Sequence, residues 1–390
     1  MIPFNKPYLT GKEMHYMYQA VYSGKISGNG IYTKKCQRYF EQRYGIKKAL
    51  LTTSCTDALE MCALLAEVKP GDEVIVPSYT FVSTALAFVR QGAKIVFADS
   101  RPDHPGMAED ALEDLITSRT KVIVPVHYAG IACDMDKIMH LAEKYDLIVI
   151  EDAAQAVEAS YKGKQLGSIG HMAAFSFHET KNIIAGEGGL LAINDSKFMD
   201  RSEVIWEKGT NRAEFLRGEV NKYEWIDVGS SFLPSEITAA FLWAQLEFIE
   251  EIQEKRKEIW NHYQNGLKTW ANAYNIKQPI LPNYAENNAH IYYLCFNNSD
   301  QREYVINKLH EYNIHSASHY LSLHKSEYNL NESNDEVKAL PMSKKYTNCL
   351  LRLPLFYELT HEQQDKIIKV LTDIEVDAIM DNKLLTTVNH

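Results

Sequence analysis

Two side chains in this sequence have types that could act together on one organic cofactor. Lys181 lies in the stretch Ser176–Asn182, shortly before the glycine-rich residues 186–189, and Asp152 follows the apolar run at 147–150. A lysine amine can form a Schiff base with an aldehyde, and a carboxylate can keep a pyridine nitrogen protonated. The pair therefore indicates pyridoxal 5'-phosphate. Alone, each residue has a simpler explanation, Lys181 as an exposed loop lysine and Asp152 as a turn residue.

A third motif could hold the phosphate of such a cofactor. Ser54, Cys55 and Thr56 follow the first expected strand and open a helix near Asp57. A helix N-terminus offers unpaired N–H groups and a partial positive charge, which together bind phosphate. The hydroxyl groups of Ser54 and Thr56 can add donors. An ordinary helix cap at this position is the alternative.

The composition limits the class of protein. The chain has 390 residues, 45% apolar and 24% charged, as expected for a globular protein of two domains. Its net charge of −10 argues against nucleic acid as a partner. The six cysteines form no Cys-x-x-Cys pair and no two histidines have metal-ligand spacing, so we expect no metal site. No apolar run reaches the ~18 residues of a membrane helix, and residues 1–7 lack a signal-peptide core. We therefore expect a cytoplasmic protein without a membrane partner.

The first half of the chain alternates between strand and helix patterns. The sequence predicts seven strands, at 48–53, 73–77, 94–98, 121–126, 147–151, 173–177 and 189–194. The helical patterns between them cover 56–66, 83–90, 108–117 and 135–144. Several strands are continuously apolar, which is typical of strands buried on both faces of a largely parallel sheet. This alternation predicts an α/β fold.

The pattern changes after Ser235. Residues 235–262 predict one long helix that could connect two domains. Beyond it we expect a strand at 290–296, a helix at 301–312, a loop at 325–340, a strand at 350–353, a helix from about 360 and a frayed end at 377–390. We place the domains at 1–240, an N-terminal segment with a large cofactor-binding domain, and at 241–390, a linking helix with a small C-terminal domain.

Together these motifs resemble the sugar-nucleotide aminotransferases of the pyridoxal-phosphate-dependent, aspartate-aminotransferase-like (fold type I) superfamily. The likeness extends from residue 3 to about 371, and it is carried by residues 45–60, 77–84, 125–130, 151–155, 175–189 and 319–324. It implies a large domain with a mainly parallel seven-stranded sheet and a smaller α+β C-terminal domain. It also implies a homodimer with active sites at the subunit interface.

The resemblance also implies roles for individual residues. Lys181 would form the Schiff base with the cofactor, and Asp152 would pair with the pyridine nitrogen. Gln155 would hydrogen-bond the phenolic oxygen of the ring, and Phe81 would stack on the ring face. The residues expected to hold the cofactor phosphate are Ser54, Cys55, Thr56 and Ser176, and those expected near the sugar are His319 and Tyr320.

The sequence departs from the family pattern at four positions. Cys55 replaces a glycine of the phosphate loop, and Ser322 replaces a proline after His319-Tyr320. Ser231 and Leu233 replace an asparagine and an arginine, and the asparagine is the residue that reaches the cofactor phosphate of the neighbouring subunit. Because serine is shorter, this contact between subunits is an open question here.

Within the family, the likeness is greatest to members that make dTDP-4-amino-4,6-dideoxygalactose. It implies transfer of an amino group from L-glutamate, which leaves as 2-oxoglutarate, to the 4-keto carbon of dTDP-4-keto-6-deoxy-D-glucose. The gluco epimer, a 3-amino-3,6-dideoxyhexose and a uridine nucleotide stay open. Related dehydratases carry histidine where this chain has Lys181, which argues against dehydration. A non-catalytic sensor of sugar nucleotides is the most distant alternative.

Overall fold

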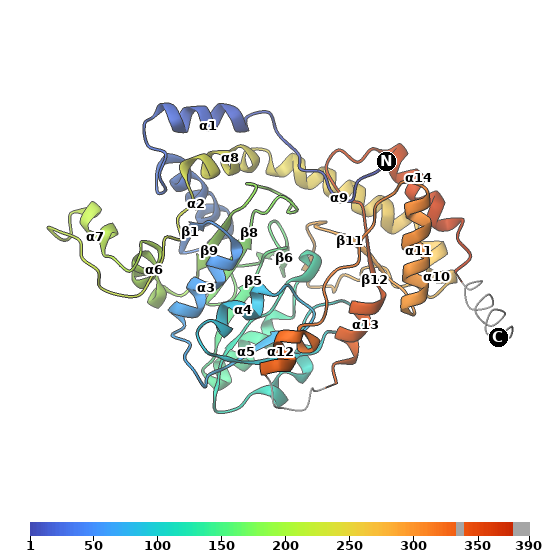
Figure 1. The fold of residues 1–390 in the computed structure, drawn as a ribbon, viewed down its shortest axis with the longest axis horizontal. Coiled ribbons are helices and arrows are strands. Elements are labelled where there is room, and N and C mark those ends of the chain that lie inside the picture. Colours follow the sequence, from blue (N-terminus) through green and yellow to red (C-terminus); the bar gives the residue numbers. More distant parts are fainter. Residues whose placement is uncertain (333–338, 377–390) are drawn as a thin grey trace.

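A seven-stranded sheet forms the centre of the computed structural model, which describes residues 1–332 and 339–376 (Figure 1). Its strand order is β1-β9-β8-β5-β4-β2-β3. The strands are β1 (Lys48–Thr52), β2 (Glu73–Pro77), β3 (Lys94–Ala98), β4 (Thr120–Ile123), β5 (Ile148–Asp152), β8 (Met172–Ser176) and β9 (Gly189–Ile193). Strand β9 is antiparallel to both its neighbours, and all other neighbouring pairs are parallel. The prediction of a mainly parallel seven-stranded sheet is confirmed.

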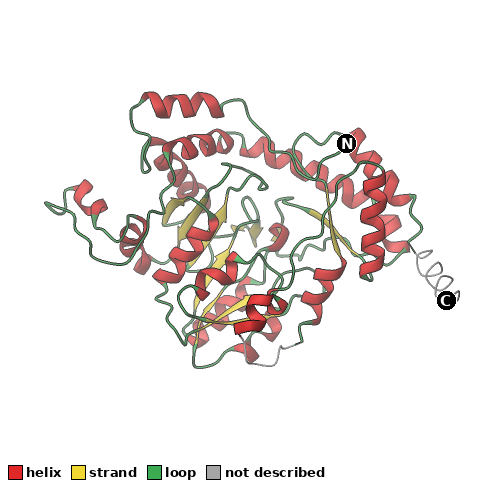
Figure 2. Cartoon of the chain, viewed as in Figure 1, coloured by secondary structure: helices red, strands yellow, loops and turns green. Residues whose placement is uncertain are grey.

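Alternate residues of each strand enter two different cores, one on each face of the sheet. Ile75 packs in the core that includes α2, α5 and α8, whereas Val74 and Val76 pack in the core that includes α3, α4 and α6. Figure 2 shows helices on both sides of the strands. Their bounds are α2 (Ile31–Tyr44), α3 (Cys55–Leu65), α4 (Ser83–Val89), α5 (Met135–Tyr145), α6 (Met199–Trp206) and α8 (Glu236–Leu246). This burial on both faces explains the continuously apolar strands.

A separate hydrophobic core lies in the C-terminal part of the chain. It packs helices against the antiparallel pair β11 (Tyr292–Cys295) and β12 (Leu350–Leu353). Its helices are α9 (Ile249–Gly266), α10 (Lys268–Ala273), α11 (Ser299–Glu311) and α14 (His361–Thr372). Helix α13 (Pro341–Cys349) leads into β12. The predicted domain boundary near residue 240 stays a prediction.

The long helix predicted over 235–262 is wrong as one element. The structure has two helices, α8 and α9, separated at Glu247 and Phe248. No proline or glycine marks this break, which coincides with a long-range contact: Tyr16 Oη donates to Glu247 Oε2 at 2.7 Å. The sequence pattern continues through the break because both helices bury apolar residues.

Two further segments differ from the expectation. Residues 108–117 form two short 3₁₀ turns, Glu109–Ala111 and Glu113–Leu115, in place of a helix. The carboxylate of Glu109 is buried, where it accepts hydrogen bonds from Arg101 and from the backbone of Asp134. The loop predicted at 325–340 begins with a helix, α12 (Glu327–Glu332), and residues 333–338 lie outside the described part, as does the predicted frayed end at 377–390.

Helices α2, α6, α10 and α13 had no prediction, and neither had the remaining elements. They are helices α1 (Glu13–Tyr22) and α7 (Arg212–Arg217) and a small sheet of β10 (Ala285–Glu286), β6 (Ser160–Tyr161) and β7 (Lys164–Gln165). In Figure 1, α7 extends away from the central sheet. Among the described residues, no helix has both the length and the apolar character needed to cross a membrane.

Candidate active site

One cavity of about 470 Å³ lies where loops from the carboxyl edge of the sheet meet the C-terminal core. Ligands of open α/β sheets bind at this edge. All ten residues singled out in the sequence line this cavity: Ser54, Cys55, Thr56, Phe81, Asp152, Gln155, Ser176, Lys181, His319 and Tyr320. The structure therefore brings them together, and the individual roles predicted for them stay predictions.

Asp152 is the last residue of β5 and is almost fully buried. Its Oδ2 accepts from Thr84 Oγ1 at 2.7 Å, and its Oδ1 accepts from the backbone N–H of Ala154 at 3.1 Å. Burial raises the pKa of Asp152, while these two hydrogen bonds and the charge of Lys181 oppose that rise. A buried carboxylate with so few partners is best stabilised by a cation facing it.

Lys181 lies in the loop between β8 and β9, where its backbone N–H donates to the carbonyl of His178 at 2.9 Å. Burial lowers the pKa of Lys181, the Cys55 and Asp152 groups oppose this, and the charge of Arg352 lowers it further. A lowered pKa increases the fraction of neutral amine, which is the nucleophilic form.

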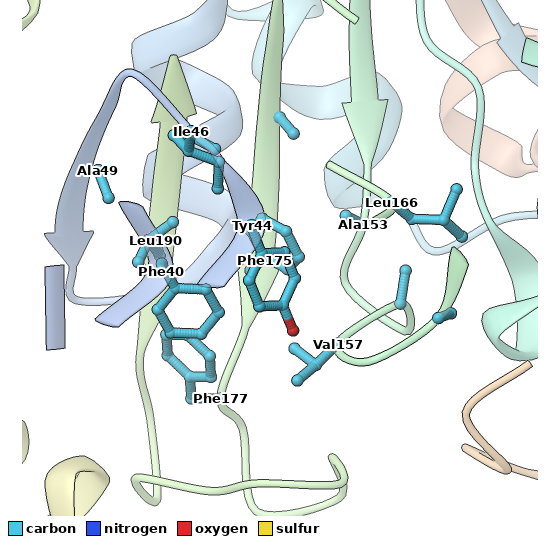
Figure 3. Packing of buried hydrophobic residues seen from close by; sticks show 14 of the residues in the cluster. Phe40, Tyr44, Ile46, Ala49, Ala153, Val157, Leu166, Phe175, Phe177 and Leu190 are labelled. Carbon is cyan, nitrogen blue, oxygen red and sulfur yellow. The ribbon is translucent and has the colours of Figure 1, made fainter. Parts of the chain in front are cut away.

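Apolar packing fixes both ends of this loop. Phe175 and Phe177 flank Ser176, and both rings pack against Phe40 of α2, with ring centroids 5.6 and 5.5 Å apart (Figure 3). Phe177 and Gly188 then continue the pairing of β8 and β9 through a backbone hydrogen bond of 2.9 Å. Ser176 is therefore fixed at the end of β8, and the loop that contains Lys181 starts and ends on paired strands.

The expected phosphate loop forms the first turn of α3. Ser54 Oγ caps the helix by accepting from the N–H of Asp57 at 3.0 Å, so its hydroxyl has the ordinary capping role. Thr56 Oγ1 lies 2.7 Å from Ser83 Oγ. A Cβ on Gly189 would stand 2.4 Å from the Ser54 carbonyl oxygen and 2.5 Å from the Cys55 nitrogen. Only glycine lets β9 approach this helix start so closely.

The opposite wall of the cavity is aromatic. His319 and Tyr320 stack with ring centroids 3.6 Å apart, and Tyr128 Oη lies 2.7 Å from His319 Nδ1. Gln155 links this wall to the sheet, because its Nε2 donates to Tyr320 Oη at 2.9 Å while its Oε1 accepts from the N–H of Ala129 at 2.7 Å. Burial lowers the pKa of His319, and the charge of Arg352 lowers it further, so this imidazole is neutral.

Phe81 also lines the cavity but is 55% exposed. Its ring centroid lies 6.1 Å from that of Tyr320. An exposed aromatic face at a cavity wall is available for stacking on a planar ring, as the sequence predicts.

Thr84, Arg352 and His290 are among the cavity residues that were not predicted from the sequence. Thr84 holds Asp152, but no motif distinguishes it from other helix-start threonines. Arg352 had a visible signal, since it is the single charged residue in the apolar strand β12. His290 is the first residue of the strand predicted at 290–296, where a histidine is usually explained as structural.

The tautomer of His290 follows from its partners. Asn182 Nδ2 donates to Gln253 Oε1 at 2.6 Å and to the carbonyl of Asn288 at 2.8 Å, so Asn182 Oδ1 must be an acceptor. His290 Nδ1 lies 2.9 Å from this oxygen and therefore carries the proton. Burial holds the pKa of His290 well below its usual value. The ring is neutral, and its Nε2 keeps a free lone pair in a residue that lines the cavity.

These groups fit pyridoxal 5'-phosphate. Lys181 supplies an amine for the aldehyde, and Asp152 supplies the buried anion that a protonated ring nitrogen needs. The N–H groups at the start of a helix have no acceptor within the helix, and at α3 they belong to the cavity-lining residues Cys55 and Thr56. The aromatic wall matches a planar ring.

Known proteins share this architecture. Spore coat polysaccharide biosynthesis protein SpsC of Bacillus subtilis is 31% identical over 96% of this chain and 97% of its own length. GDP-perosamine synthase of Caulobacter vibrioides is 31% identical over 95% of this chain and 97% of its own. The solved structure of Spr1654 from Streptococcus pneumoniae in its PLP form has a TM-score of 0.88 at 27% identity, covering 97% of this chain and 99% of that one. DesV of S. venezuelae, solved in complex with a ketimine intermediate, has a TM-score of 0.87 at 27% identity, covering 95% and 98%.

The sequence profile of one family covers nearly the whole chain. It matches residues 7–372, a span that includes every cavity residue discussed above. The resemblance to the sugar-nucleotide aminotransferases is therefore confirmed at the level of the family, and the fold type I architecture is confirmed as well. The chain belongs to the DegT/DnrJ/EryC1/StrS aminotransferase family.

Proposed function

We propose that this aminotransferase moves an amino group from L-glutamate to C4 of dTDP-4-keto-6-deoxy-D-glucose and makes dTDP-4-amino-4,6-dideoxy-D-galactose. The protein is an enzyme of the aminotransferase class, and pyridoxal 5'-phosphate is its cofactor. The observation that carries the proposal is the presence of the Lys181 amine and the buried Asp152 carboxylate in one cavity. A ketone and an amino acid can exchange an amino group at such a pair.

When bound, pyridoxal phosphate supplies an aldehyde that carries amino groups and a ring that accepts electrons from a broken C–H bond. Asp152, in this proposal, holds the ring nitrogen in its protonated form. The start of α3 and Ser176 would hold the phosphate, and Phe81 would stack on the ring. Lys181 would hold the aldehyde, and its neutral amine would be the base that moves a proton.

Several observations support a sugar nucleotide as the amino acceptor. Curated relatives include GDP-perosamine synthases and a protein of spore coat polysaccharide biosynthesis. The choice of a dTDP-linked 4-keto sugar with the galacto product rests on the sequence likeness at residues 54–56, 176–182, 207–212 and 229–231. The aromatic wall of His319 and Tyr320 offers a surface for the sugar or the base.

A GDP-linked 4-keto-6-deoxyhexose is the second candidate. Its support is specific, because relatives 31% and 30% identical to this chain over 95% and 93% of its length are named GDP-perosamine synthase. The two candidates share the reaction at C4 and differ in the nucleotide.

The decisive experiment offers the purified holoenzyme L-glutamate with either dTDP-4-keto-6-deoxy-D-glucose or its GDP-mannose-derived counterpart, and NMR identifies the amino sugar. We expect turnover of the dTDP substrate and an axial amine at C4. An equatorial amine would indicate the gluco epimer, and amination of 3-keto isomers alone would overturn the substrate assignment. Preference for the GDP sugar would favour the second candidate.

We also propose a homodimer with active sites shared between subunits. The support comes from the projecting segment, residues 212–228, which begins with α7. Large apolar residues are exposed on it, including Trp225, Ile226 and Val228. Ser231 follows this segment and is exposed, outside the cavity of its own chain as the described residues form it. A second subunit could cover the apolar side chains and bring Ser231 to the other cavity.

A further inference from the structure

Asn182, the residue after the reacting lysine, returns the loop from the surface to the interior of the protein. Residues 178–181 are half-buried or exposed, whereas Asn182 is only 7% exposed. Its side chain does not line the cavity described above, although its neighbour Lys181 does. An amide that is buried without hydrogen-bond partners is costly, so its partners show what holds this end of the loop.

Every partner of the Asn182 amide belongs to the C-terminal part of the chain. Its Nδ2 donates to Gln253 Oε1 of α9 at 2.6 Å and to the backbone carbonyl of Asn288 at 2.8 Å. Its Oδ1 accepts from His290 Nδ1 at 2.9 Å. Both N–H groups and the carbonyl oxygen of the amide are therefore used. The loop of the reacting lysine is thus bound to α9 and to the segment 288–290, which precedes β11.

The same segment also holds the residues that follow Asp152. Asn288 Nδ2 donates to the backbone carbonyls of Gln155 at 2.8 Å and Val157 at 2.7 Å. There is little space at this contact, because a Cβ on Gly130 would stand 1.9 Å from Asn288 Oδ1. One buried segment of the C-terminal part therefore contacts both halves of the cofactor site, the loop with the lysine and the strand end with the aspartate.

We propose that Asn182 is a positioning residue that holds Lys181 at the separation from Asp152 that one cofactor ring requires. The aldehyde and the nitrogen of pyridoxal phosphate lie at opposite positions of the ring, so the amine and the carboxylate must be held at a fixed separation. Asn182 sets this separation from outside the cavity, through its bonds to the segment 288–290. The inference rests on the proposed attachment of the cofactor aldehyde to Lys181.

The test compares two forms of the cofactor that differ in their need for the lysine. Pyridoxal phosphate bonds to Lys181, whereas pyridoxamine phosphate has an amine in place of the aldehyde and cannot. Apoenzyme is mixed rapidly with pyridoxal phosphate, and the absorbance change gives the rate constant of covalent attachment. A misplacement of about 1 Å can slow a reaction of aligned groups about 100-fold, so Asn182→Ala should lower this rate constant about 10- to 100-fold. Its dissociation constant for pyridoxamine phosphate should stay within about threefold of the wild type.

Two further variants separate positioning from a general loss of stability. Gln364→Ala is the matched control, because it removes another buried amide of the C-terminal core, which donates to the carbonyl of Ile259 at 2.6 Å. It should lower the melting temperature and leave both cofactor measurements unchanged. Gln253→Ala removes one partner of Asn182 without changing a residue of the cavity, and it should slow attachment less than Asn182→Ala does. If Asn182→Ala does not fold, Gln253→Ala decides by the same criterion.

The outcomes that contradict the proposal differ from those that contradict the proposed function. Attachment at the wild-type rate in Asn182→Ala would overturn the positioning role, as would an equal loss for both forms of the cofactor. A wild-type protein that binds pyridoxal phosphate without covalent attachment would overturn the assignment of Lys181, on which the proposal rests. Failure of the dTDP sugar to react would count against the proposed substrate only.

Discussion

Burial acts in opposite directions on the two central residues of the cavity. It lowers the pKa of Lys181 and raises that of Asp152, because the charged form of each loses its hydration. For the lysine this favours the neutral amine that reacts. For the aspartate it disfavours the anion, which the hydrogen bond from Thr84 then stabilises. Lys181 and Asp152 were both identified from the sequence, whereas Thr84, which stabilises the Asp152 anion, was not.

Replacing Lys181 with alanine should abolish turnover. Without the amine the cofactor has no covalent attachment, and the proton transfer assigned to Lys181 loses its base, a loss of at least about 10³-fold. Steady-state kinetics measures the turnover, and the absorbance spectrum should lose the band of covalently bound cofactor. Lys164→Ala, which changes an exposed lysine of β7, serves as the control. Full activity of the Lys181 variant would end the assignment.

Removing the hydroxyl that supports Asp152 should shift the pH dependence of activity. The Thr84 hydrogen bond lowers the pKa of Asp152, so Thr84→Val raises this pKa. A carboxyl group with a higher pKa becomes an anion only at higher pH. The acidic limb of the kcat/KM profile should therefore move up by about 1 pH unit. Thr84→Ser keeps the hydroxyl and should keep the wild-type profile; an unmoved limb in the valine variant would contradict the idea.

At the scale of elements, the strands were predictable and the helix breaks were not. All seven strands of the sheet coincide within a few residues with apolar runs, because burial on both faces requires such runs. The break between α8 and α9 coincides with a contact of Glu247 with Tyr16, more than 200 residues away, which no local sequence pattern predicts. The two 3₁₀ turns near Glu109 likewise coincide with contacts of its buried carboxylate, to Arg101 and to the backbone of Asp134, which is 25 residues away. The same holds for the cavity. Its motif residues were predicted from the sequence, whereas Thr84, His290 and Arg352 were identified only from the tertiary structure.

The approach of β9 to α3 makes Gly189 a test of the phosphate site. The Cβ of alanine at this position would stand 2.4 Å from the Ser54 carbonyl oxygen, so Gly189→Ala must displace the helix start. Overpacking of this kind costs about 1–3 kcal/mol. Titration with pyridoxal phosphate should show an affinity at least about 5-fold weaker.

The neighbouring glycine provides the control for this change. A Cβ on Gly188 would come no closer than 3.3 Å to the side chain of Ala185, so Gly188→Ala adds the same atom with little displacement. Its cofactor affinity should stay close to that of the wild type. Equal affinities for both variants would show that the helix start of α3 does not hold the phosphate.

At the scale of the whole molecule, the cavity depends on the central sheet with its packed faces and on the C-terminal core. The sheet core supplies Asp152 and the loops with Lys181 and Ser54, while the C-terminal part supplies the residues His319, Tyr320 and Arg352. Neither part alone encloses the site. Among the described residues, the projecting segment around α7 contributes no side chain to the cavity. It carries apolar side chains whose exposure to water is unfavourable.

This segment should therefore mediate dimer formation. Light scattering after gel filtration should give twice the 44.6 kDa mass of one chain. Trp225 is 81% exposed, and Trp225→Asp places a charge in the proposed interface, so this variant should shift toward the monomer at micromolar concentration. Because the interface would bring Ser231 to the other subunit, cofactor affinity should fall together with the dimer fraction. Tyr312→Asp changes a residue that is 52% exposed at the end of α11, and it should leave both quantities unchanged. A monomeric wild type with full cofactor affinity would show that each chain completes its own site.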